Sequence, residues 1–146
     1  MSGYKKLEFE IKLSGTYWNK VPDFSIHVND QLISTGTVND TQTFVKFSVE
    51  LAEYTPHKLK IRLENKTNDD TKTDAQGAII NDMLLNIDTI SMDGIELGHL
   101  KWSESEFIPD DHIHRPILKN CVNLGWNGAY TLSFEAPFYI WLLERM

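Results

Sequence analysis

Hydrophobic and polar residues alternate with a period of two along most of this 146-residue chain. Such alternation indicates β-strands that bury one face and expose the other. The pattern is clear at residues 7–13, 24–28, 45–51, 59–63, 85–92 and 130–134. Helical periodicity is almost absent, so the sequence predicts an all-β fold: a two-sheet antiparallel β-sandwich or jelly roll.

Turn signals separate these strands without suggesting a domain boundary. Asn29-Asp30 and Asp93-Gly94 are typical turn pairs. The acidic stretch 102–116 is predicted to be a long surface loop, and the apolar run 138–143 is too short to classify by its period. We therefore expect a single domain over residues 1–146.

Charge and cysteine content narrow the range of partners. The net charge is -7 and the pI is about 5.1, which argues against nucleic acid and against an anionic membrane surface. Cys121 is the only cysteine, so no intrachain disulfide can form. Residues 1–8 lack the apolar core of a signal peptide, and no apolar stretch approaches the roughly 20 residues of a membrane span.

An oxygen-rich segment lies before the strand predicted at residues 85–92. It contains Asp69, Asp70 and Asp74, and the strand is introduced by Asn81 and Asp82. Carboxylate and carbonyl oxygens in such density suit a hard cation such as Ca2+. The alternative is that these aspartates only keep a long loop solvated.

The strand after Asp82, which ends at the Asp93-Gly94 turn, resembles the signature strand of the calcium-dependent xylan-binding carbohydrate-binding modules. The resemblance extends over residues 7–97, with 98–146 as an extension that completes the sandwich or docks a partner. It implies a sugar-binding β-sandwich in which Asp82 and the Asn81 carbonyl hold Ca2+, and sugar hydroxyls complete the metal shell. Asp74, Asp69 or Asp70 would supply further ligands. Lys66 departs from the family pattern, because it stands where the family has an Asp.

Aromatic residues are candidates for stacking on a sugar ring. Trp18, Trp102 and Trp126 lie in polar surroundings. Trp18 is the best candidate ligand-binding residue because Tyr17 precedes it in a predicted loop. Packing in the core is an equally common role for such residues.

No residue pattern predicts catalysis. His112 and His114 form a His-x-His pair without a further ligand in sight, and Cys121 has no ordered base beside it. Glu104 and Glu106 are neighbouring carboxylates whose spacing in the fold the sequence does not give. We therefore expect a binding or structural protein and not an enzyme.

The absence of a secretion signal and of disulfides suits a phage virion accessory protein that is made in the host cytoplasm and bound in an assembly or oligomer. Its partners would be a glycan or other virion proteins. Phe138, Tyr139 and Trp141 are the candidate partner interface, because their segment is strongly apolar. The alternatives are a purely structural assembly protein without sugar or metal binding, and a free calcium-dependent lectin.

Overall fold

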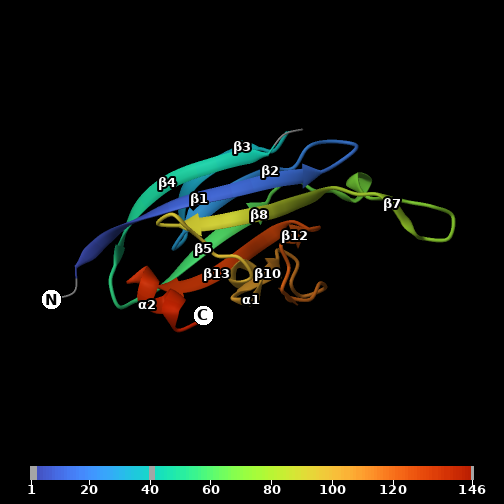
Figure 1. Ribbon diagram of the computed structural model, residues 1–146. Helices are drawn as coiled ribbons and strands as arrows, with labels where there is room; N and C mark the ends of the chain where they lie inside the picture. Colours follow the sequence, from blue (N-terminus) through green and yellow to red (C-terminus); the bar gives the residue numbers. More distant parts are fainter. Residues whose placement is uncertain (1–2, 40–41, 146) are drawn as a thin grey trace.

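The computed structural model describes residues 3–39 and 42–145, which form two antiparallel β-sheets packed face to face (Figure 1). The predicted fold class, an all-β antiparallel sandwich, is confirmed. The hydrophobic core lies between the sheets, and both sheets contribute residues to it. Leu13 and Leu85 are buried in one sheet, and Ile61, Tyr130 and Leu132 are buried in the other.

The first sheet has the strand order β12-β8-β1-β4, with β9 paired to β8. At its centre, Phe9 of β1 pairs with Phe47 of β4 on one side and with Met92 of β8 on the other. The Phe9 and Phe47 rings stack at 4.8 Å between centroids. The strands are β1 (Tyr4–Thr16), β4 (Thr43–Ala52), β8 (Leu84–Met92), β9 (Ile95–Glu96) and β12 (Asn123–Leu124).

The second sheet has the order β11-β10-β13-β5-β2-β3. Strand β13 lies between β10 and β5, so the C-terminal third of the chain supplies a central strand of this sheet. The strands are β2 (Asp23–Val28), β3 (Gln31–Thr37), β5 (Pro56–Leu63), β10 (Ser105–Pro109), β11 (Leu118–Lys119) and β13 (Gly128–Glu135).

Both predicted turn pairs lie in left-handed backbone. Asn29 and Asp30 have φ of 51° and 67°, and they join β2 to β3. Asp93 and Gly94 have φ of 50° and 78°, and they join β8 to β9. Two consecutive positive φ values suit the twist of a tight hairpin.

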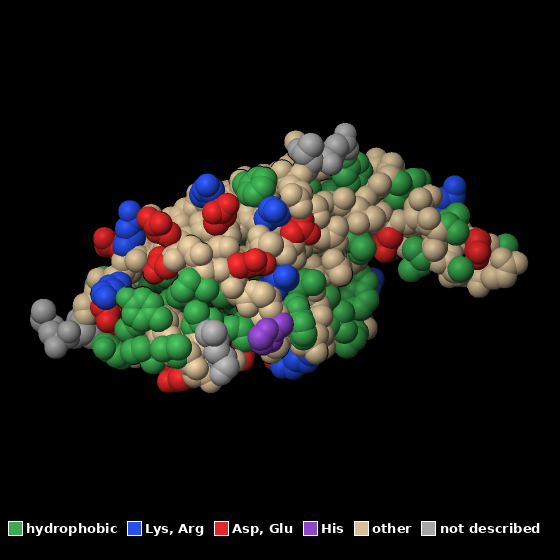
Figure 2. Space-filling view, in the orientation of Figure 1, with side chains coloured by type: hydrophobic (Ala, Val, Ile, Leu, Met, Phe, Trp, Pro, Cys, Tyr) green, Lys and Arg blue, Asp and Glu red, His purple; other side chains and the backbone are tan. Residues whose placement is uncertain are grey.

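A two-stranded hairpin, β6 (Lys72–Thr73) with β7 (Ile79–Asn81), projects from one end of the sandwich (Figures 1 and 2). A single 3-10 turn, η1 (Asn68–Asp70), precedes it. The Asp74 carboxylate accepts hydrogen bonds from the N–H groups of Gln76 and Ala78, both at 2.9 Å, and so closes the hairpin turn.

Two segments differ from the sequence-based expectation. Residues 102–116 are not one long loop, because they contain β10. The short helix α1 (Leu100–Ser103) also overlaps the start of that stretch. The apolar run 138–143 is the helix α2 (Phe138–Leu143), whose Phe138, Trp141 and Leu142 are buried. No helix in the described part of the chain is long and apolar enough to cross a membrane.

Candidate functional site

Loops at one end of the sandwich surround an open pocket of about 700 Å³, which we call the end pocket. Most of its residues lie in loops that follow β5 and β10 or precede β8 and β13, and the others, among them Phe107 and Leu118, belong to strands. The volume is within the roughly 300–1,000 Å³ of small-ligand sites. The residues that matter for its chemistry are Lys66, Thr71, Asp82, Arg115, Trp126 and Asn127.

The Asp82 carboxylate in this pocket is bound to a lysine of the same chain. Its Oδ1 atom accepts hydrogen bonds from Lys66 Nζ at 2.5 Å, Thr71 Oγ1 at 2.7 Å and the Met83 N–H at 2.8 Å. Burial alone would raise the pKa of Asp82, but these hydrogen bonds outweigh it and lower the pKa below its ordinary value. Asp82 is therefore an ionised, internally neutralised group.

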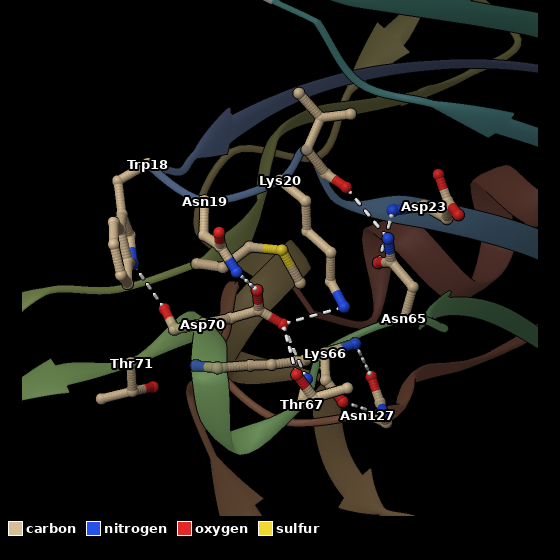
Figure 3. Close-up of polar contacts among 12 residues, drawn as sticks. Trp18, Asn19, Lys20, Asp23, Asn65, Lys66, Thr67, Asp70, Thr71 and Asn127 are labelled. Atoms are coloured by element: carbon tan, nitrogen blue, oxygen red, sulfur yellow. Dashed lines mark hydrogen bonds and ion pairs between the residues drawn. The ribbon is translucent and has the colours of Figure 1, made fainter.

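A second carboxylate, that of Asp70, is fully buried next to Thr67 and Thr71, which line the pocket. Figure 3 shows it among Asn19, Lys20 and Thr67. Its Oδ2 atom lies 3.0 Å from Lys20 Nζ and accepts the Thr67 N–H at 2.8 Å. Its Oδ1 atom accepts a hydrogen bond from Asn19 Nδ2 at 3.0 Å. Burial acts to raise the pKa of Asp70, but the hydrogen bonds from Thr67, Lys20 and Asn19 outweigh it and lower the pKa to about 2. This carboxylate ties the β1–β2 loop to η1.

The structure does not gather the predicted calcium ligands around one point. Asp69 is exposed in η1, Asp74 closes the hairpin turn, and Asn81 is exposed at the end of β7. Asp70 and Asp82 each pair with a different lysine. Across residues 3–39 and 42–145, no three His, Cys, Asp or Glu side chains are placed to hold a metal ion together.

Trp126 lines the end pocket together with Phe107, whereas Trp18 does not. The Arg115 guanidinium lies over the Trp126 ring at 4.4 Å from its centroid, a distance typical of a cation–π contact. Trp18 is 43% exposed at the same end of the molecule, and its indole N–H donates to the Asp70 carbonyl at 2.8 Å. Tyr17 is partly buried and packs against the core.

The three residues predicted as a partner interface do not share one environment. Phe138 and Trp141 belong to the buried core, where their rings stack at 6.0 Å between centroids. Tyr139 is 53% exposed on the other side of α2. Of the three, only Tyr139 is thus available to a partner protein.

The remaining residues considered from the sequence have separate partners or face solvent. Glu104 pairs with Arg145 at 3.4 Å, and Glu106 pairs with Lys119. Cys121 is half-buried, and burial raises the pKa of its thiol, which makes it a poor nucleophile. His112 and His114 are exposed, and His114 Nδ1 lies 2.8 Å from Asp111 Oδ1.

No protein-family model and no curated protein matches this chain. Two solved structures do. The protein vCBM60 in complex with galactobiose has a TM-score of 0.54 at 15% identity, over 86% of this chain and 96% of that one. The selenomethionine form of vCBM60 has a TM-score of 0.58 at 12% identity, over 86% and 89%. The likeness is one of fold.

The selenomethionine vCBM60 structure is described as part of an evolutionary link, by circular permutation, between two families of calcium-dependent carbohydrate binding modules. In this chain, the oxygens around Asp82, where the resemblance places calcium, do not fit that ion. Ca2+ needs six to eight oxygens at about 2.3–2.6 Å. Here Asp82 Oδ1 already accepts three hydrogen bonds, one of them from an ammonium group. Asp70 is enclosed by donors in the same way.

Proposed function

We propose that this protein is a non-catalytic carbohydrate-binding domain that takes a glycan in the end pocket. The observation that carries the proposal is an open pocket of mixed polar and apolar lining, with an indole and a guanidinium, at the loop end of the sandwich. The fold likeness to carbohydrate-binding modules supports it, since one of those structures holds galactobiose. The expected ligand is a short stretch of a polysaccharide.

The chemistry of the pocket suits a sugar. A pyranose presents hydroxyl groups that both donate and accept, and C–H faces that are apolar. The Arg115 guanidinium offers several N–H donors in a fixed plane, and its contact with Trp126 limits the positions that this plane can take. Asp110 and Asp111 add acceptor oxygens at the rim, where both are exposed. Ile79 and Leu118 provide apolar contact.

The carboxylates of the pocket are placed for binding and not for glycoside hydrolysis. A glycosidase needs a carboxyl group whose pKa is raised so that it can donate a proton. The hydrogen bond from His114 lowers the pKa of Asp111, and Asp82 has a lowered pKa as described above. Both carboxylate oxygens of Asp110 accept hydrogen bonds from Arg62 Nη2, each at 2.9 Å. None of these arrangements supplies a general acid.

Calorimetric titration with galactobiose and with xylohexaose, preceded by a glycan array, tests the proposal. We expect binding to weaken by about tenfold or more in Arg115→Ala and in Trp126→Ala, because each change removes a contact worth over about 1 kcal/mol. Trp102→Ala is the matched control, since Trp102 is 40% exposed and does not line the pocket. Absence of binding to any glycan on the array would refute the proposal.

A protein-assembly role is a second candidate, favoured by the exposed face of α2. Tyr139, Ile140 and Leu143 are 53%, 47% and 69% exposed, and Figure 2 shows hydrophobic side chains gathered at that end of the molecule. The location on a virion remains a prediction. Ile140→Asp with Leu143→Asp would abolish self-association, measured by light scattering, if this face is an interface. A monomeric wild-type protein would count against self-assembly.

A further inference from the structure

The end pocket holds a cation that belongs to the chain itself. The Lys66 side chain is only 8% exposed, although lysine side chains normally extend into water. Its ammonium lies 2.5 Å from Asp82 Oδ1, and Lys66 lines the pocket. Figure 3 shows the Lys66 side chain running past Asp70 toward the side of Thr71.

The backbone of Lys66 is fixed by a reciprocal pair of hydrogen bonds. The Lys66 N–H donates to Asn127 Oδ1 at 2.7 Å, and Asn127 Nδ2 donates to the Lys66 carbonyl at 2.8 Å. These bonds join the end of β5 to the start of β13, the two neighbouring strands on which the pocket is built. The ammonium is thus held by both its backbone and its carboxylate partner, which reduces the ordering cost of ligand binding.

The ammonium group also retains hydrogen-bonding capacity. An ammonium has three N–H donors. Among the described residues, Asp82 is the one side chain or carbonyl that accepts from Lys66 Nζ. Gly125 lies beside the ammonium, since a Cβ added there would be 4.0 Å from Nζ. Two N–H donors therefore remain for oxygen atoms of a molecule in the pocket.

A divalent ion and this ammonium cannot share Asp82 Oδ1. A Ca2+ ion at about 2.3–2.6 Å from that oxygen would lie within about 5 Å of Nζ, where like charges repel strongly in a partly buried site. It would also have to displace the hydrogen bonds from Thr71 and Met83. Binding of the ion would require Lys66 to leave a position in which its side chain is more than nine-tenths buried.

We propose that the Lys66 ammonium takes the place of a metal ion in the end pocket, so that sugar hydroxyls are recognised by a fixed ammonium–carboxylate pair and without calcium. The hydroxyl oxygens accept from Lys66, and the hydroxyl hydrogens donate to Asp82 Oδ2 or to Asp110. This inference rests on the proposed function, because it names the groups that recognise the sugar in the same pocket.

The first arm of the test needs no glycan. Chelator-treated wild-type protein is titrated with CaCl2 in a calorimeter, and its melting temperature is compared in CaCl2 and in EDTA. We expect no heat of binding and no shift. Calcium binding that is lost in Asp82→Asn would overturn the inference and leave sugar binding possible through the metal.

The second arm measures affinity for galactobiose and xylohexaose in CaCl2 and in EDTA. The dissociation constants should agree within about twofold, and Lys66→Met should weaken binding by about 10- to 100-fold. Lys20→Met is the matched control, since Lys20 also pairs with a carboxylate but does not line the pocket. The double variant Lys66→Met with Asp82→Asn guards against misfolding caused by an unpaired carboxylate.

The outcomes separate the two proposals. Glycan binding that survives EDTA but is unchanged in Lys66→Met and in the double variant would overturn the role of the ammonium and leave the proposed function intact. Glycan binding that EDTA abolishes would also overturn the role of the ammonium, because it would show that a metal ion is needed. No glycan binding under any condition would refute the proposed function, and the ammonium's role in sugar recognition with it, while the calcium titration still decides whether Asp82 accepts a metal.

Discussion

Replacing Asp70 by Asn tests how strongly the buried carboxylate stabilises the loop end of the molecule. Asp70 is 0% exposed, and its two oxygens act only as acceptors toward Thr67, Lys20 and Asn19. An asparagine keeps the shape but turns one oxygen into an N–H2 group that would face a donor. It also leaves Lys20 without its carboxylate, although Lys20 is 37% exposed and can turn to solvent.

The magnitude follows from the pKa of Asp70, which falls from 3.8 to about 2 on folding. A depressed pKa stabilises the folded state by about 1.4 kcal/mol for each unit of pKa difference between the folded and unfolded states, or about 2 kcal/mol here. Because the folded pKa is the lower one, this stabilisation is complete above pH 3.8 and is lost as the pH falls toward 2. About half of it should be gone at pH 3.

Urea unfolding followed by tryptophan fluorescence measures the effect, and Trp18 reports on the site because its indole bonds the Asp70 carbonyl. At pH 7, Asp70→Asn should lower the free energy of unfolding by about 2 kcal/mol or more. The difference from wild type should shrink by about 1 kcal/mol between pH 5 and pH 3. Asp69→Asn, at an exposed neighbour, should stay within about 0.5 kcal/mol at every pH. A difference for Asp70→Asn that does not change with pH would refute this reasoning.

Two further predictions concern the frame that carries the pocket. Gly128→Ala should destabilise the protein by about 1–3 kcal/mol or prevent folding, because its Cβ would lie 2.5 Å from the Ile108 carbonyl oxygen and 2.6 Å from Pro109 Cα. Gly125→Ala is the control in the same urea assay, because its Cβ would meet the flexible Leu84 side chain at 3.2 Å and lie 4.0 Å from Lys66 Nζ, with no backbone contact. Trp141→Ala should cost about 3–5 kcal/mol by leaving a cavity under α2, whereas Leu143→Ala, on the exposed side of that helix, should change the unfolding free energy by less than about 0.5 kcal/mol.

The strands that the sequence revealed are those whose inward positions are filled by large apolar residues. In β1, Phe9, Ile11 and Leu13 are buried, and the polar residues between them are not. Strand β10 was not predicted from the sequence because its inward positions are Ser105, Phe107 and Pro109, of which only the phenylalanine is a large apolar residue typical of a strand. The Ser105 hydroxyl is satisfied locally by the Lys101 carbonyl at 2.7 Å, a bond that a period-two pattern cannot reveal.

Two other misses have different causes. Strand β3 is at the edge of its sheet, so it buries little and carries few apolar residues. Helix α2 did leave a signal: Phe138, Trp141 and Leu142 are the buried residues, and their i, i+3, i+4 spacing is that of a helix face. The run was too short for that spacing to exclude a strand.

The site was harder to predict than the fold because its chemistry depends on pairing between distant positions. An acid-rich stretch suggests a cation site only if its carboxylates are not already paired. Lys20 is separated from Asp70 by 50 positions, and nothing local reveals that its ammonium reaches that carboxylate. Lys66 is visible in the sequence as a misplaced cation beside the acidic stretch, but its bond to Asp82 depends on how η1 and the β6–β7 hairpin turn the chain back.

The same pairing explains why a net charge of -7 does not make the loop end a strongly anionic surface. Asp70, Asp82 and Asp110 are each neutralised by a lysine or an arginine at hydrogen-bonding distance. Arg115 lines the same pocket without a carboxylate within ion-pair distance among the described residues. A pocket in which Asp82 and Asp110 are paired with cations of the same chain, and which keeps an ammonium and a guanidinium with spare N–H donors, favours ligands rich in acceptor oxygens over metal cations.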